Sequence, residues 1–155
     1  MGVMGTKKIA TNRRARFNYE ISETYEAGIV LLGSEVKSLR AGHADLKDSY
    51  AAVHGGEMWL VGLRISPYEY ARDGGHDPER ERKLLLHKRE IEKIGAKIAE
   101  KGLSLLPLNL YFKDGKVKVE LGLGKGKVQR DKRETLRRRQ ADREMERAMR
   151  HRSLE

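Results

Sequence analysis

All nine aromatic residues of this chain lie before Lys113, so the chain divides into a body that can build a hydrophobic core and a tail that cannot. Residues 125–155 hold 12 basic and 6 acidic residues, and their apolar positions form only a thin helical stripe. Such a segment cannot bury enough apolar surface to offset the entropy lost on ordering it. We therefore predict a body over residues 18–124 and a basic tail over residues 125–155. A basic arm over residues 1–17 precedes the body, and we expect it to be mobile at its start and ordered where it meets the body.

Three glycines mark the predicted junction between body and tail. Gly122, Gly124 and Gly126 alternate with Leu123 and Lys125, a pattern that favours a flexible exit from the body. The tail beyond this junction has a helical pattern, but isolated helices of this length are marginal in water. We expect the tail to be largely disordered in the free chain and helical when bound to an anionic surface.

Composition narrows the possible functions. The 155 residues carry a formal net charge of +10, which fits one domain with a polyanionic partner. The absence of cysteine excludes disulfides, thiol nucleophiles and cysteine-ligated zinc. The five histidines accompany no nucleophile or HExxH motif, and no apolar run approaches the roughly 20 residues of a membrane span. We expect a cytoplasmic, non-enzymatic protein with no metal, cofactor or membrane partner.

Strand signals dominate the predicted body. Two extended runs flank Gly55-Gly56 and two more flank Asp114-Gly115, and each pair predicts a β-hairpin. Pro107, within one of these runs, predicts a sheet edge or a bulge. A further strand signal over residues 19–32 brings the body to about six strands. A mainly β, OB-like antiparallel barrel is the simplest arrangement that leaves no long open edge.

Two or three helices are expected beside this barrel. Ser34 can cap a short helix that runs to Arg40, with Glu35 in the first turn, where the helix dipole favours a carboxylate.

A longer helical segment follows a predicted loop over Pro67–His76. Asp77-Pro78 is a typical helix start, and the helical pattern continues to Gly102. A break near His87 would divide this segment into two helices.

Six blocks of sequence, in order along most of the chain, together resemble the small protein B family, the transfer-messenger-RNA (SsrA) binding proteins of bacterial trans-translation. The blocks are Asn12–Arg16, Gly28–Arg40, Asp48–Ala51, Arg82–Ile91, Pro107–Phe112, and Lys125–Lys127 with Asp131–Arg133. One block alone is weak evidence, whereas six in order are specific. The chain departs from the family pattern at Phe17-Asn18, where His-Asp is common, and at Val128 and Arg130 near the start of the tail.

The resemblance implies an OB-like barrel that binds the tRNA-like domain of transfer-messenger RNA. It also implies delivery of that RNA to stalled ribosomes, beside elongation factor Tu, which is linked through the shared RNA. The basic tail is then expected in the vacant messenger channel, at the decoding region of the small subunit. One alternative stays open, which is an OB-type assembly factor that binds ribosomal RNA only.

The residues expected to contact RNA are mostly basic. The cations suit phosphates, although each one alone is equally typical of a solvated surface. Glu35 can accept hydrogen bonds from base edges or 2′-hydroxyls, or serve only the helix dipole, and Tyr111 fits the RNA surface and the core equally well. The set in the body is Arg13, Arg14, Arg16, Glu35, Lys37, Arg40, Asn109, Tyr111, Lys125 and Lys127, and the set for the ribosome in the tail is Asp131, Lys132, Arg133, Arg137, Arg138 and Arg139.

Overall fold

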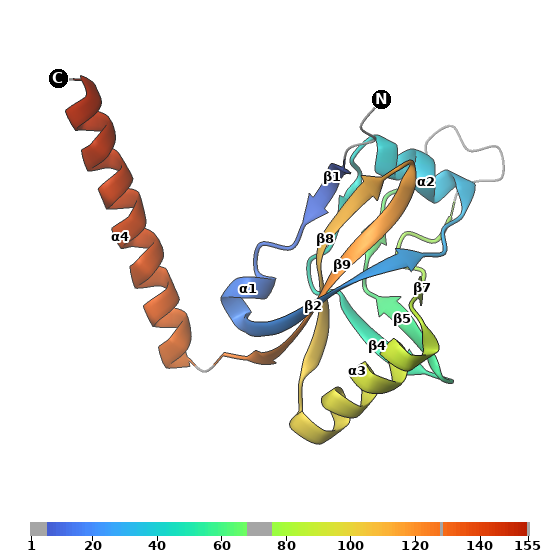
Figure 1. Cartoon of the computed structure of the whole chain (residues 1–155). Helices are drawn as coiled ribbons and strands as arrows, with labels where there is room; N and C mark the ends of the chain where they lie inside the picture. The colour runs from blue at the N-terminus through green and yellow to red at the C-terminus, as the bar shows by residue number, and fades with distance from the viewer. Residues whose placement is uncertain (1–5, 68–75, 128, 155) are drawn as a thin grey trace.

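The computed structural model describes residues 6–67, 76–127 and 129–154 (Figure 1). The first five residues of the predicted arm, most of the predicted loop Pro67–His76, and Val128 lie outside the described residues. The described strands are β1 (Thr6–Thr11), β2 (Tyr19–Ile29), β3 (Ala44–Asp45), β4 (Tyr50–His54), β5 (Glu57–Val61), β6 (Arg64–Ile65), β7 (Arg82–Leu85), β8 (Ser104–Lys113) and β9 (Lys116–Gly126). The described helices are α1 (Ala15–Asn18), α2 (Gly33–Arg40), α3 (Lys88–Lys101) and α4 (Gln129–Leu154).

Six of these strands close into a ring. The hydrogen-bonded order is β8, β4, β5, β7, β2 and β9, and β9 pairs back with β8. Each of these pairings is antiparallel, and β3 and β6 form a separate two-stranded sheet. Closure of the ring removes the open strand edges that would otherwise pair with other chains. The prediction of a mainly β, OB-like antiparallel barrel with flanking helices is confirmed.

The interior of the barrel is apolar, because alternate side chains of each strand point inward. Helix α3 packs against β5 and buries Ile91 and Ile94 beside the same core. The fully buried strand residues include Met58, Leu60, Leu110, Val119 and Leu121.

Both predicted hairpins form at their predicted turns. Gly55 and Gly56 join β4 to β5 with φ angles of 62° and 77°, and Asp114 and Gly115 join β8 to β9 with φ angles of 52° and 79°. Positive φ at both central positions is what a tight type I′ hairpin turn requires. The register between β8 and β9 shifts at Pro107, so the predicted bulge is also confirmed.

The helix predicted from Asp77-Pro78 is wrong in its first part. Arg82–Leu85 form strand β7, which completes the ring between β5 and β2. A short apolar run fits a strand and a helix equally well by pattern, and here the open edges of two neighbouring strands decide. Helix α3 begins only at Lys88, after the predicted break at His87, and ends before Gly102.

The described part of the N-terminal arm belongs to the sheet from Thr6 onward, so the order begins earlier along the chain than the sequence suggests. Strand β1 pairs with one end of β8, on the same edge that β4 occupies at Leu105. Asn12 lies between these two partners of β8. Its side-chain amide donates to the carbonyls of Pro107 at 3.1 Å and of Leu46 at 3.4 Å, which ties the arm to the barrel.

The glycine run near residue 124 is not a flexible exit. Gly122 and Gly124 are buried within β9, which continues to Gly126, two residues past the predicted end of the body. A Cβ atom on Gly124 would lie 2.4 Å from the carbonyl oxygen of Glu20 in β2, and one on Gly122 would lie 2.8 Å from Leu108. These glycines therefore permit close approach of neighbouring strands.

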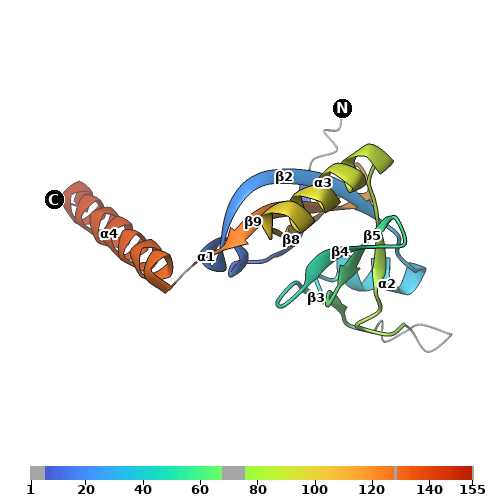
Figure 2. The ribbon, with the colours of Figure 1, turned by 90° about the horizontal axis from the view of Figure 1, so that it is seen from below.

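Helix α4 extends away from the barrel (Figure 1, Figure 2). At the start of this extension the backbone amide of Lys127 donates to the carbonyl of Asn18 at 2.8 Å, and its ammonium group donates to the hydroxyl of Thr135 at 2.9 Å. Further along, the guanidinium of Arg139 lies 5.6 Å from the ring centre of Phe17 in α1. The body therefore extends structurally to Lys127, and whether α4 is stable in the free chain stays a prediction.

None of the described helices is long and apolar enough to span a membrane.

Candidate nucleic-acid interface

The basic cluster nearest the N-terminus surrounds α1. Ala15 anchors this short helix, since it is buried against Leu106 and shares a small apolar cluster with it. Its neighbours Arg13, Arg14 and Arg16 are all exposed. Among the described residues Arg16 forms one long ion pair of 3.9 Å, with Glu120, so this cluster presents positive charge to solvent.

The start of β2 and the end of β9 bring two more predicted residues to the same end of the barrel. Lys125 is exposed on β9 in register with Glu20, and Lys127 lies beside the start of α4. Lys37 and Arg40 are exposed on α2, at a different end of the molecule (Figure 1). The predicted cations therefore divide into two groups.

Asn109 and Tyr111 on β8 both contact carboxylates. The amide of Asn109 donates to Glu120 at 3.0 Å, and the hydroxyl of Tyr111 donates to Glu26 at 2.5 Å. Burial raises the pKa of Tyr111 and its bond to Glu26 raises it further, while the same bond holds the pKa of Glu26 below its ordinary value. Both side chains are half-buried, so each offers only part of its surface to an RNA.

Glu35 does not lie on the surface, which contradicts the prediction that it contacts RNA. Its carboxylate accepts hydrogen bonds from Arg82 at 2.5 Å, from Arg80 at 2.6 Å and from the backbone amide of Leu32 at 2.8 Å. Burial by itself would raise the pKa of Glu35, but these hydrogen bonds outweigh it and hold that pKa below its ordinary value. The fully buried side chain leaves no accessible oxygen for a base or a 2′-hydroxyl.

Arg82 is also fully buried and connects α2 to several other segments. Besides Glu35, its guanidinium donates to the backbone carbonyls of Leu63 at 2.6 Å, Arg80 at 2.8 Å and Pro78 at 3.2 Å. This cluster fixes the position of α2 and hence of its exposed cations. Sequence reasoning missed it because Glu35 and Arg82 are 47 residues apart.

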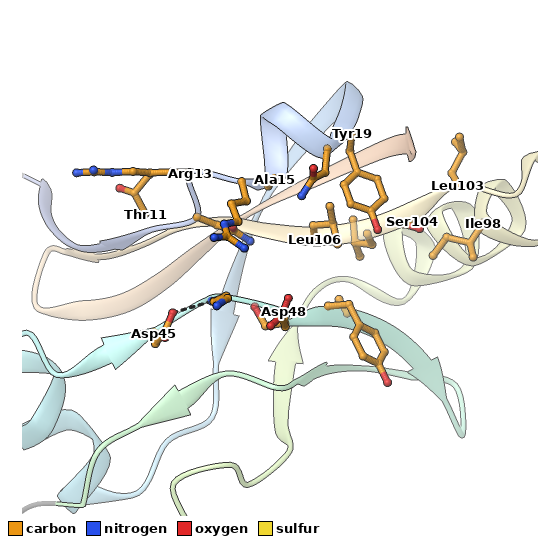
Figure 3. Close-up of a pocket in the computed structure, with 18 residues that line it drawn as sticks. Thr11, Arg13, Ala15, Tyr19, Asp45, Asp48, Ile98, Leu103, Ser104 and Leu106 are labelled. Atoms are coloured by element: carbon orange, nitrogen blue, oxygen red, sulfur yellow. Dashed lines mark hydrogen bonds between the residues drawn. The ribbon is translucent and has the colours of Figure 1, made fainter. Parts of the chain in front are cut away.

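A groove of about 640 Å³ opens beside α1 (Figure 3). Figure 3 shows Tyr19 and Ala15 on one wall, with Asp45 and Asp48 on the wall opposite. The other lining residues used below are Arg13, Arg14, Lys47, Tyr50, Leu105 and Leu106.

A second hollow, of about 610 Å³, lies at the other end of α3. Leu85 lines it and is 52% exposed, beside Gly28, where an added Cβ atom would come within 3.3 Å of that leucine. Lys83, Lys88 and Lys118 line the same hollow. Sequence reasoning missed this surface because the segment was predicted as a helix, whereas the strand alternation that buries Leu84 turns Leu85 outward.

The predicted tail residues lie on α4. Arg133, Arg137, Arg138 and Arg139 are exposed, and Asp131 and Lys132 lie near the start of the helix with side chains outside the described residues. Within the described ranges, no three His, Asp or Glu side chains come together as a metal site would require.

Comparison with known proteins identifies the family. A family model described as SmpB protein matches residues 9–151. An SsrA-binding protein of Gloeothece citriformis is 59% identical over 145 residues, which cover 93% of this chain and 94% of that protein. An SsrA-binding protein of Thermosynechococcus vestitus is 56% identical over 147 residues, which cover 94% of this chain and 97% of that protein.

A solved structure described as "tmRNA-SmpB: a journey to the center of the bacterial ribosome" agrees with these matches. It has a TM-score of 0.66 and 51% sequence identity, and the match covers 83% of this chain and 94% of that chain. The family resemblance seen in the six sequence blocks is therefore confirmed, and the chain belongs to the SmpB protein family.

Proposed function

We propose that this chain is an RNA-binding adaptor that binds the tRNA-like domain of transfer-messenger RNA and delivers it to stalled ribosomes for trans-translation. The observation that carries the proposal is its identity of more than half, along nearly its whole length, with proteins named SsrA-binding protein. The similarity to a structure whose description names both tmRNA and the bacterial ribosome supports it.

The body binds the folded RNA. Arg13, Arg14 and Lys125 at one end of the barrel, and Lys37 and Arg40 on α2, are exposed cations on elements that the barrel positions. Rigid placement suits phosphate recognition, because the protein does not have to order these groups when the RNA arrives. Each phosphate contact steepens the fall of log K with log salt by about 0.7–0.9.

The hollow around Leu85 extends this surface. An exposed leucine packs well against the face of a sugar or base, and the neighbouring Lys83, Lys88 and Lys118 supply charge for the phosphates on either side. Glu35, in contrast, contributes by holding α2 in place through Arg80 and Arg82.

The tail supplies a second, separate contact. Its exposed arginines suit ribosomal RNA in the messenger channel where no messenger is present. Elongation factor Tu joins the complex through the shared RNA. Trans-translation takes place in the cytoplasm, where translating ribosomes are found.

A gel shift with labelled transfer-messenger RNA tests this proposal. The full chain should retain the labelled RNA when transfer RNA and ribosomal RNA fragments are present in about hundredfold excess. The alternative function, an assembly factor for ribosomal RNA, predicts the opposite order of competition. If ribosomal RNA fragments displace the labelled RNA and transfer RNA does not, the result would favour that alternative.

A further inference from the structure

The groove beside α1 is a preformed site with walls held by specific contacts. Asn12 links the two walls, because its amide donates to the carbonyl of Leu46 in the opposite turn as well as to β8. In that turn the hydroxyl of buried Ser49 also donates to Leu46. A Cβ atom added to Gly62, the residue directly after β5, would lie 3.0 Å from the carbonyl oxygen of Asp48. The turn that contains Asp48 therefore packs closely against the end of β5. A ligand that enters the groove does not have to order it.

The floor of the groove is apolar, and aromatic side chains contribute to its walls. Leu105 and Leu106 are buried at its lining, and Tyr19 and Tyr50 contribute to its walls. Tyr50 is 49% exposed, although it is a large aromatic residue on a barrel strand. Neither tyrosine hydroxyl has a hydrogen-bond partner in the part of the chain that the structure describes. Such a lining suits a flat aromatic ligand with polar edges.

Three cations line the same groove, together with the carboxylates of Asp45 and Asp48, so its lining carries a net positive charge. Arg13, Arg14 and Lys47 form no ion pair with any of the described residues, whereas seven ion pairs occur elsewhere in the described chain. Unpaired arginine and lysine beside an aromatic slot match the phosphates on either side of a nucleobase. The charge and the shape of the groove therefore favour the same class of ligand.

We infer that this groove binds one unpaired nucleotide of a single-stranded RNA segment, with its base against Tyr50 and its phosphates on Arg13, Arg14 and Lys47. This contact goes beyond the recognition of folded RNA proposed above, because it needs a base that is not stacked in a helix. It lies at the opposite end of α3 from the hollow around Leu85.

Asp48 gives the groove a base preference. Its carboxylate lies on the wall opposite Tyr19 (Figure 3), has no hydrogen-bond partner among the described residues, and can only accept. The Watson–Crick edge of guanine presents two adjacent donors, whereas that of uracil presents one donor between two acceptors. The groove should therefore prefer guanine to uracil.

An NMR titration of the full ¹⁵N-labelled chain with the pentanucleotides UUGUU and UUUUU tests the inference. UUGUU should bind more tightly and should shift the amides of Asn12, Ser49 and Tyr50. Tyr50→Ala should weaken binding of UUGUU about tenfold, since one base–aromatic stack is removed. Val53→Ala is the matched control, because it shortens a similarly exposed side chain, three residues further along β4 and outside the groove. It should leave the affinity unchanged.

Two further variants separate the phosphate contact from the base contact. Arg14→Gln should lower the slope of log K against log salt by about 0.7. Asp48→Asn, which tolerates the positive φ of this position, should remove the preference for guanine while UUUUU binds as before.

Shifts confined to α4, or equal affinity of Tyr50→Ala and the unaltered chain, would overturn the inference. Equal binding of UUGUU and UUUUU would overturn the role given to Asp48. These assays contain no folded RNA, so their failure is distinguishable from failure of the gel shift with transfer-messenger RNA.

Discussion

The barrel and the tail helix α4 differ in how far they bury their side chains. The barrel buries Met58 and Leu60 completely, and it buries even a carboxylate and a guanidinium, those of Glu35 and Arg82. In α4 the apolar side chains remain in solvent, with exposures of 53% for Leu136, 63% for Met145 and 67% for Met149.

This difference assigns a different kind of recognition to each region. The barrel holds a fixed surface before any partner arrives, so it can recognise the shape of a folded RNA. The tail has charge but little packing to define its shape, so its structure depends on the surface that it meets. The predictions below test the rigidity of the first region and the adaptability of the second.

The largest effect is expected where the barrel buries charge. Glu35→Gln removes the negative charge that faces Arg80 and Arg82 and leaves the buried guanidinium of Arg82 uncompensated. We expect the free energy of unfolding to fall by about 3–5 kcal/mol in urea denaturation. Glu57→Gln is the control, because its ion pair with Lys83 is partly exposed and should contribute less than about 1 kcal/mol. Equal losses in both variants would contradict the buried-charge account.

The same cluster predicts a dependence of stability on pH. The pKa of Glu35 is lower in the folded chain than its ordinary value of 4.5. Its contribution to stability is therefore fully present above that ordinary value and is lost as the pH falls through the folded pKa. The free energy of unfolding, measured from about pH 7 down to about pH 3, should fall more steeply in the unaltered chain than in Glu35→Gln.

A smaller effect is expected from close strand packing in the barrel. Gly124→Ala would place a Cβ atom 2.4 Å from the carbonyl oxygen of Glu20 and force β9 away from β2. We expect a loss of about 1–3 kcal/mol in the free energy of unfolding. Gly126→Ala on the same strand is the matched control, since its nearest neighbour, Tyr19, would be 3.9 Å away. If both glycines tolerate alanine equally, the run is a flexible linker after all.

The smallest effect is expected in the tail. We predict that the amides of α4 exchange with little protection in the free chain, because its exposed apolar side chains provide little tertiary packing to stabilise the helix. Phe17→Leu removes the ring beneath Arg139 and should lower the remaining protection by about 0.5–1 kcal/mol. Strong protection throughout α4 would contradict the adaptable tail.

Local signals predicted the parts of the fold that local sequence determines. Gly55-Gly56 and Asp114-Gly115 specify turns within a few residues, so both hairpins were placed correctly from sequence. Pro107 likewise predicted the bulge that the structure shows between β8 and β9. The family was also recognisable, because its sequence blocks occur in order along the chain.

Features that depend on distant partners could not be predicted in the same way. Strand β7 exists because β5 and β2 leave room for it in the ring, and Glu35 is buried because Arg80 and Arg82 return to it from far along the chain. The glycines before Lys125 were interpreted as flexible, since a sequence does not reveal that Glu20 lies against them. Of the predicted site residues, Arg13, Arg14, Arg16, Lys37 and Arg40 are exposed and Glu35 is buried, and their contacts with RNA stay a prediction.

Truncation before Asp131 is the most direct test of the central claim. This claim is that the barrel recognises the shape of the folded RNA and that the tail contributes charge for a separate contact. Two quantities should be measured in parallel with the full chain. They are the affinity of the truncated chain for transfer-messenger RNA and the tagging, by trans-translation, of the unfinished peptides on stalled ribosomes. The account predicts an affinity nearly equal to that of the full chain, together with loss of tagging. Loss of RNA binding on removal of the tail would contradict it.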